Sequence, residues 1–129
     1  KGEFIYSIKI PIIKNNIFKA YKISKRFDDD ISSVCGSFNF IIKKNKITKA
    51  TIAYGGMSAI PKRALAIEKK LINSQFSENS FHQAVGLINK DFSPLDDMRA
   101  SSQYRLAVAK NLLLKAFYEI KNKQRIRIN

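Results

Sequence analysis

The stretch 33–56, "SVCGSFNFIIKKNKITKATIAYGG", decides the fold class because it holds two β-rich runs separated by a short polar segment. Aromatic and β-branched residues are enriched in strands, and the intervening "KKNK" at 43–46 is typical of a hairpin connection. Two glycines at 55–56 give the backbone the freedom that a turn or bulge requires. The stretch therefore predicts two antiparallel strands.

Two further runs come before this hairpin. "EFIYSIKI" at 3–10 alternates loosely and is followed by Pro11, and "IFKAYKIS" at 17–24 has a similar β-rich composition. We expect one strand in each run. Residues 25–31 include three consecutive aspartates, a residue type depleted in strands, so a loop is expected there.

The second half of the chain shows helical periodicity. Pro61 suits the first turn of a helix over 61–72. The apolar stripe of this helix consists of Ala64, Leu65, Ile67, Leu71 and Ile72. A second helix is expected over about 79–89, and the longest over about 101–121, where Ser101 can act as the N-cap.

Strands followed by helices predict an α+β sandwich. We expect an antiparallel sheet of about three to four strands with three helices packed on it, in a single domain over residues 1–129. The segment "DFSPLDDMRA" at 91–100 is turn-like. Because the sequence opens at Lys1 without a methionine, we expect a fragment of a longer protein.

Composition narrows the possible chemistry. The 129 residues are 45% hydrophobic, which is typical of a globular chain, and every apolar run is too short to span a bilayer. Cys35 and His82 are the only residues of their types, so an intrachain disulfide and a cysteine–histidine zinc site are excluded. A partly buried thiol and a helix-surface imidazole are favoured over a nucleophilic pair. We predict no catalytic residue, no metal and a cytoplasmic location.

The formal net charge of +14 raises the hypothesis of nucleic-acid binding. The lysines are scattered, however, and no recognised nucleic-acid motif accompanies them. We therefore expect no nucleic-acid or membrane partner. One alternative function, of a different class, stays open. In it, the chain is a stand-alone basic module that binds nucleic acid or an acidic protein.

Three separated motifs resemble one family, in the same order. They are "YKISKRFDDDIS" at 21–32, "ATIAYGGMSAIPKRA" at 50–64 and "DFSPLDDMRASSQYRLAVAKNLL" at 91–113. They are similar to the C-terminal part of the flavin domain of xanthine dehydrogenases, the unit that also forms the C-terminal domain of carbon monoxide dehydrogenase flavoproteins. The Asp-Asp-Ile ending of the first motif resembles the xanthine dehydrogenase branch more. A carbon monoxide or aldehyde-type molybdenum hydroxylase is the alternative.

The resemblance implies a role in electron transfer. Xanthine dehydrogenases pass electrons from a molybdenum cofactor through iron–sulfur clusters to FAD and then to NAD. The implied partners are an FAD-binding N-terminal half, an iron–sulfur domain, a molybdenum-binding subunit and NAD as the electron acceptor. FAD would be shared with that N-terminal half, and the isolated chain is expected to be inactive.

The resemblance also implies cofactor-binding residues. Lys22 would lie near the pyrimidine side of the flavin, Arg26 and Asp29 in a loop beside the ring, and Ile5 against the cofactor. Phe27 departs from the basic residue of mammalian relatives. The alternative for the three aspartates is a solvated turn that pairs with Lys25 and Arg26.

The other two motifs are interpreted as structural. In "YGGM" at 54–57, the glycines allow a strand and a helix to approach closely, and Met57 fills a gap. In "DDMRASSQYR" at 96–105, Asp97 and Arg99 are expected to form an ion pair. Arg105 is expected to reach across a domain interface.

Overall fold

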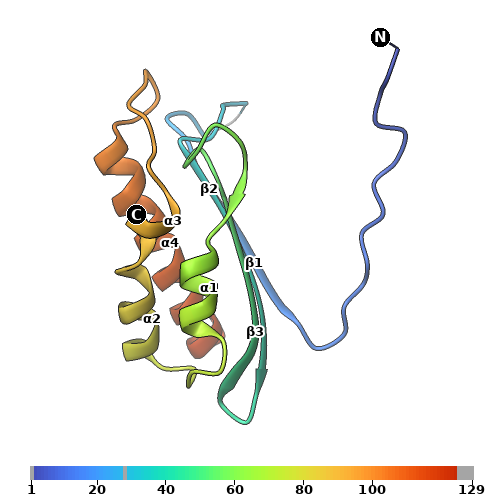
Figure 1. Ribbon diagram of the computed structural model, residues 1–129, viewed down its shortest axis with the longest axis vertical. Coiled ribbons are helices and arrows are strands. Elements are labelled where there is room, and N and C mark those ends of the chain that lie inside the picture. Colours follow the sequence, from blue (N-terminus) through green and yellow to red (C-terminus); the bar gives the residue numbers. More distant parts are fainter. Residues whose placement is uncertain (1, 28, 125–129) are drawn as a thin grey trace.

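The computed structural model describes residues 2–27 and 29–124 and has an α+β fold, as predicted. Four strands form one antiparallel sheet in the order β1-β2-β3-β4, with bounds Ile17–Ile23, Val34–Lys43, Lys46–Gly55 and Lys62–Arg63. The helices are α1 Leu65–Leu71, α2 Glu78–Val85, α3 Ile88–Asp91 and α4 Ser102–Asn122. All four helices lie on one side of the sheet (Figure 1). Among the described residues, no helix is long and apolar enough to cross a membrane.

The β2–β3 hairpin forms where the sequence predicts it. Lys44 and Asn45 connect the strands with positive φ angles of 46° and 60°. Two left-handed residues in a two-residue connection match the right-handed twist of the flanking strands, and asparagine adopts this conformation readily. Local turn chemistry therefore sets the register of the two longest strands.

Side-chain alternation gives the sheet two different faces. The inner face, toward the helices, carries mostly large apolar residues: Tyr21, Ile23, Val34, Phe38, Phe40, Ile52 and Tyr54. The outer face carries mostly smaller or polar residues: Phe18, Ala20, Lys22, Cys35, Ser37, Asn39, Thr51, Ala53 and Gly55. In the described structure, the helices cover only the inner face (Figure 1).

Aromatic rings fill the space between the sheet and the helices. Phe81 of α2 lies 4.8 Å from Phe117 of α4 and 5.7 Å from Phe40 of β2, measured between ring centroids. All three are fully buried, as is Met57, which fills a gap in the core as expected. Such ring pairs add to the free energy of burial. The long helix α4 is thereby fixed across the sheet, with Ser101 as its predicted N-cap accepting from the Tyr104 N–H at 3.2 Å.

The predicted strand over 3–10 is wrong. Residues 2–13 form an extended segment that pairs with nothing in the described structure and points away from the domain (Figure 1). Phe4, Ile5, Tyr6, Ile8 and Ile10 are all at least 77% exposed. A strand needs a neighbour to satisfy its backbone groups, and a β-rich composition does not supply one. We call residues 2–13 the N-terminal arm.

The first helix begins later than predicted. Lys62–Arg63 pair with β3 as strand β4, so α1 starts at Leu65 rather than at Pro61. The Asp91 carboxylate accepts hydrogen bonds from the N–H groups of Ala66 and Ile67 and so caps α1 from a distant part of the chain. Leu65 is 59% exposed and does not belong to the buried stripe.

The predicted second helix is two short helices. α2 ends at Val85 with Gly86 as its C-cap, and α3 begins at Ile88. Phe81, Ala84, Val85 and Ile88 of this region are nevertheless all buried.

Candidate functional site

Three loops meet at one end of the sheet, opposite the β2–β3 hairpin (Figure 1). Residues 24–33 join β1 to β2, residues 56–61 join β3 to β4, and residues 92–101 join α3 to α4. Each loop belongs to a different one of the three motifs in the sequence. We call residues 24–33 the aspartate loop and residues 92–101 the facing loop.

The aspartate loop is shaped by its own polar groups. The Ser24 hydroxyl donates to the Arg26 carbonyl at 2.7 Å, and the Arg26 backbone N–H donates to the Asp30 carboxylate at 3.0 Å. The guanidinium of Arg26 also lies 3.6 Å from Asp30. The backbone hydrogen bond from Arg26, together with its charge, lowers the pKa of Asp30. Asp29 is exposed and adopts a left-handed conformation with φ of 48°.

An open depression of about 500 Å³ lies where β1 runs into this loop. It is lined by Lys22, Ile23, Ser24, Lys25, Arg26 and Phe27. The depression therefore combines three cationic side chains with an aromatic ring that is 96% exposed. Such a lining suits a planar, electron-rich ligand that carries partial negative charge.

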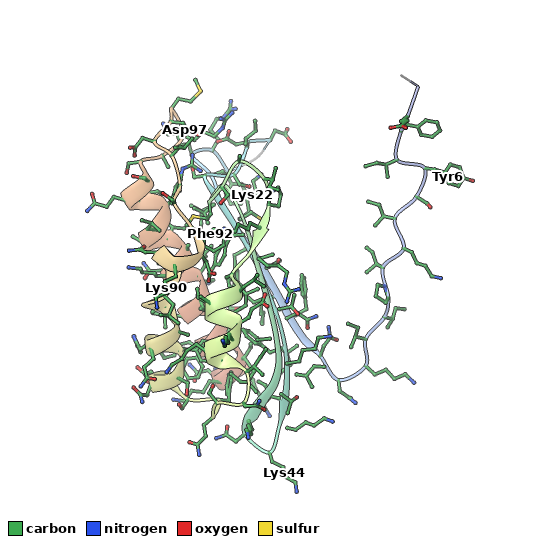
Figure 2. The ribbon with its side chains drawn as sticks, viewed as in Figure 1. Tyr6, Lys22, Lys44, Lys90, Phe92 and Asp97 are labelled. Atoms are coloured by element: carbon green, nitrogen blue, oxygen red, sulfur yellow. The ribbon has the colours of Figure 1, made fainter. Side chains whose placement is uncertain are left out.

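The structure brings together two of the four predicted cofactor-binding residues. Lys22 and Arg26 line the depression, and Asp29 lies three residues further along the same loop. Ile5 is not brought to them, because it lies in the N-terminal arm, which points away from the domain (Figure 1). Figure 2 shows its neighbour Tyr6 on the arm, far from Lys22.

Arg105 of α4 connects all three loops. Its Nη1 donates to the Ser33 carbonyl and, at 2.8 Å, to the Gly56 carbonyl, and its Nη2 lies 2.6 Å from the Asp97 carboxylate. The Arg105 side chain is 4% exposed. The expectation that it reaches across a domain interface is wrong, because its partners belong to this domain.

Asp97 forms its ion pair with Arg105, so the expected pair with Arg99 is wrong. Arg99 contributes only its backbone N–H, which donates to Asp97 at 2.8 Å, and the Ala100 N–H donates at 3.1 Å. These two backbone hydrogen bonds, and then Arg105, lower the pKa of Asp97. Figure 2 shows Asp97 at the loop end of the molecule.

Gly56 is required where the loops approach most closely. Its φ is 78°, and a Cβ at this position would lie 2.3 Å from the Ser33 carbonyl oxygen and 3.0 Å from Arg105 Nη1. Only glycine accepts both the backbone conformation and the contact. The "YGGM" motif therefore serves the approach of one loop to another, rather than that of a strand to a helix.

Sequence reasoning did not identify Lys25, Phe27, Ser33 and Arg105 as site residues. Lys25 lines the depression, and its Nζ donates to the Met98 carbonyl of the facing loop at 2.7 Å rather than to Asp29 or Asp30. The adjacency of Lys25 and Phe27 to Arg26 was an available signal. Ser33 and Arg105 are 72 residues apart, and no local pattern indicates their contact.

Within the part of the chain that the structure describes, no group of three His, Cys, Asp or Glu residues could hold a metal ion. Cys35 is half-buried on the outer face, directly opposite Lys22 in the register. His82 lies on α2 with its side chain about half exposed, 3.7 Å from Glu78.

Comparison with known proteins finds a matching family and similar sequences. The sequence profile of the CO dehydrogenase flavoprotein C-terminal domain matches residues 19–120. The glyceraldehyde dehydrogenase medium chain of Sulfolobus acidocaldarius is 30% identical over 120 residues, which are 93% of this chain and 42% of that protein. Xanthine dehydrogenase of Emericella nidulans is 30% identical over 93 residues, 69% of this chain and 7% of that protein. The chain thus spans less than half the length of either relative.

Solved structures show the same fold. Quinoline 2-oxidoreductase from Pseudomonas putida 86 superposes with a TM-score of 0.76 at 19% identity, over 91% of this chain and 40% of that one. Reconstituted CO dehydrogenase from Oligotropha carboxidovorans gives a TM-score of 0.77 at 20% identity, with the same coverage of each chain. With three motifs, the matched profile and the shared fold in agreement, the chain belongs to the CO dehydrogenase flavoprotein C-terminal domain family.

Proposed function

We propose that this chain forms the C-terminal part of the FAD module of a xanthine dehydrogenase-type molybdenum hydroxylase, an oxidoreductase. In this proposal, the depression beside the aspartate loop faces the isoalloxazine ring of FAD. The observation that carries the proposal is the placement of Lys22 and Arg26 at one depression, next to the exposed ring of Phe27.

The residues fit one edge of a flavin. A depression of about 500 Å³ is within the usual range for ligand pockets and accepts part of a large cofactor. Its cations suit the pyrimidine side of the ring, where two carbonyl oxygens carry partial negative charge. The sequence contains no glycine-rich phosphate-binding motif, so the rest of FAD is assigned to a separate FAD-binding half.

FAD, when bound, supplies a carrier that accepts and releases two electrons. The side chains of this domain would tune that carrier electrostatically. The Lys22 ammonium and the Arg26 guanidinium stabilise negative charge at the depression, whereas the Asp29 carboxylate opposes it. Of the two aspartates that the structure describes in this loop, Asp30 pairs with Arg26, so we assign Asp29 to the cofactor.

The N-terminal arm is assigned to the FAD-binding half. Its apolar side chains are exposed along 2–13, and burying them against a partner would be favourable. Ile5 would then contact the cofactor only in the assembled module, which agrees with the position of its neighbour Tyr6, far from Lys22 in Figure 2.

The further partners are an iron–sulfur domain and a molybdenum-binding subunit, with NAD as the electron acceptor, in the cytoplasm. The Asp-Asp-Ile sequence at 29–31 supports the xanthine dehydrogenase assignment. The match to a glyceraldehyde dehydrogenase medium chain over 93% of this chain supports an aldehyde-type enzyme as the second candidate.

Reconstitution tests this proposal. The chain is purified alone and together with its FAD-binding half, and flavin absorbance is measured after desalting. We expect flavin only in the assembled module, at a lower occupancy when Lys22 and Arg26 are both changed to methionine. A module without flavin, or the same occupancy in the double variant, contradicts the assignment of the depression. Turnover of the complete enzyme, with its iron–sulfur domain and molybdenum-binding subunit, on xanthine and on glyceraldehyde then separates the two candidate enzymes.

A further inference from the structure

We propose that Arg105 is a positioning residue that fixes the aspartate loop beside the flavin. This inference rests on the proposed function, because it assigns to Arg105 a role toward a cofactor that it does not touch. The three motifs of the sequence converge at this side chain, which links Ser33, Gly56 and Asp97.

The first step of the argument is the cost of burying this charge. A guanidinium that is 4% exposed loses most of its hydration, and only good partners offset that loss. Arg105 has two backbone carbonyls and one carboxylate, and its Nε has no hydrogen-bond partner in the described structure. An uncharged side chain at this position would avoid this cost. Retention of a charge here favours a role in fixing loop geometry.

The second step is that the contacts of Arg105 lie at the base of the aspartate loop. Ser33 ends this loop, and its N–H donates to the Ile23 carbonyl at 2.8 Å, while its carbonyl accepts from Arg105. Ile23 is the residue after Lys22. Arg105 therefore fixes both strand ends from which the loop emerges, adjacent to the depression.

The third step is that the facing loop carries the restraint to Lys25, near the start of the aspartate loop. Asp97 is held by Arg105, and the next residue, Met98, accepts from Lys25 Nζ at 2.7 Å through its carbonyl. The Arg99 carbonyl accepts from the Ser33 hydroxyl at 3.3 Å. The two loops are thus joined by two direct hydrogen bonds, and Arg105 bridges them through Ser33 and Asp97.

The chemistry of the side chain explains why an arginine is needed. Its planar fork presents donors in fixed directions, so that one residue serves three acceptors on three loops. A lysine would keep the charge but has a single nitrogen. Compared with Arg105→Met, Arg105→Lys is therefore expected to recover the stability of the fold more fully than the fixed geometry of the aspartate loop.

Hydrogen exchange on the 129-residue chain tests the clamp without any cofactor. In Arg105→Met, the Arg26 and Ser33 amides are expected to exchange at least about tenfold faster, which corresponds to losing about one ordinary hydrogen bond. Glu119→Gln is the matched control, because it removes another buried charge from α4 that pairs with Lys19. It should lower the melting temperature while leaving exchange in the aspartate loop unchanged. Equal acceleration in both variants overturns the proposal.

The flavin reduction potential of the assembled module tests the positioning role. Loss of the clamp should lower the potential, because the cations that line the depression are no longer held there, and Arg105→Lys should recover only part of the change. If the potential is unchanged although the loop amides exchange faster, Arg105 only stabilises the domain. This result overturns the inference, while the proposed function stands. If Arg105→Met does not fold, Asp97→Asn is measured in the same way. If the parent module holds no flavin, the proposed function fails and the inference fails with it.

Discussion

The two faces of the sheet are built from the same strands and carry opposite kinds of residues. On β2, the inner residues Val34, Phe38 and Phe40 are fully buried, whereas the alternate residues Cys35, Ser37 and Asn39 are only partly covered. The inner face supplies the free energy of folding, and the outer face leaves Lys22 and the depression accessible. Alternate residues along a strand therefore serve different purposes. Those on the inner face stabilise the fold, and Lys22 on the outer face is available to the cofactor.

The largest expected effect comes from truncating the inner face. Phe38→Ala removes a fully buried ring that packs on Tyr54, so it should lower the free energy of unfolding by about 3–5 kcal/mol. Phe18→Ala is the control on the outer face, where the ring is 59% exposed, and should change it by about 0.5 kcal/mol or less. Urea denaturation measures both. Comparable losses in the two variants would contradict the division between the faces.

Two glycines in the same region provide a second matched pair. A Cβ on Gly36 would lie 2.9 Å from the Phe38 ring and 3.1 Å from the Tyr54 ring, whereas one on Gly55 would meet only Cys35 Cβ at 3.7 Å. Gly36→Ala should therefore destabilise the chain by about 1–3 kcal/mol. Gly55→Ala should change stability by about 0.5 kcal/mol or less. Thermal unfolding of both variants tests this. A Gly55→Ala variant as unstable as Gly36→Ala would contradict the difference in packing between the two faces.

Charge changes at the loop end should affect the cofactor rather than the fold. In the assembled module, Lys22→Met should lower the flavin reduction potential and Asp29→Asn should raise it. Two unit charges about 4 Å apart interact by at most ~4 kcal/mol at an effective dielectric of 20. We expect a smaller net interaction of about 1.4 kcal/mol, which corresponds to a shift of about 30 mV in the potential of a two-electron couple. A redox titration of parent and variants in one buffer measures the shifts. Shifts of the same sign would contradict a role of Asp29 beside the flavin and would support the alternative that the aspartates form a solvated turn.

Acid should weaken the loop end by protonating Asp97. The pKa of Asp97 is lowered in the fold, so its contribution to stability is present above about pH 4, the ordinary range for aspartate, and is lost as the pH falls through the lowered value. Asp97→Asn should accordingly be less stable than the parent at neutral pH. The difference in melting temperature should shrink below about pH 4, and a difference that is constant with pH would contradict the assigned ion pair.

The elements that local chemistry specifies were predictable from the sequence. The hairpin at 43–46 follows from its turn residues, and α4 follows from helical periodicity and the Ser101 cap. Contacts between distant residues were not. The start of α1 depends on the carboxylate of Asp91, about 25 residues later. The local sequence at 61–64 does not indicate this contact.

The candidate site shows the same limit. Lys22, Arg26 and Asp29 were identified through a resemblance, and the structure adds that the first two share a depression. The role of Ile5 stays a prediction, because Ile5 is 80% exposed and its segment pairs with no strand of the described chain. Arg105 could not be located from periodicity alone, since a buried charge on a helix looks like an exposed one in sequence until its partners are known.

The position of β1 at the edge of the sheet has a consequence for handling the isolated protein. Its free edge and the exposed apolar arm that leads into it offer a template for pairing with a second copy, a common route to aggregation. The net charge of +14 opposes this association by mutual repulsion. Salt shortens the range of that repulsion to about 8 Å at physiological ionic strength. The chain alone should therefore stay dispersed in dilute buffer and self-associate as salt is added.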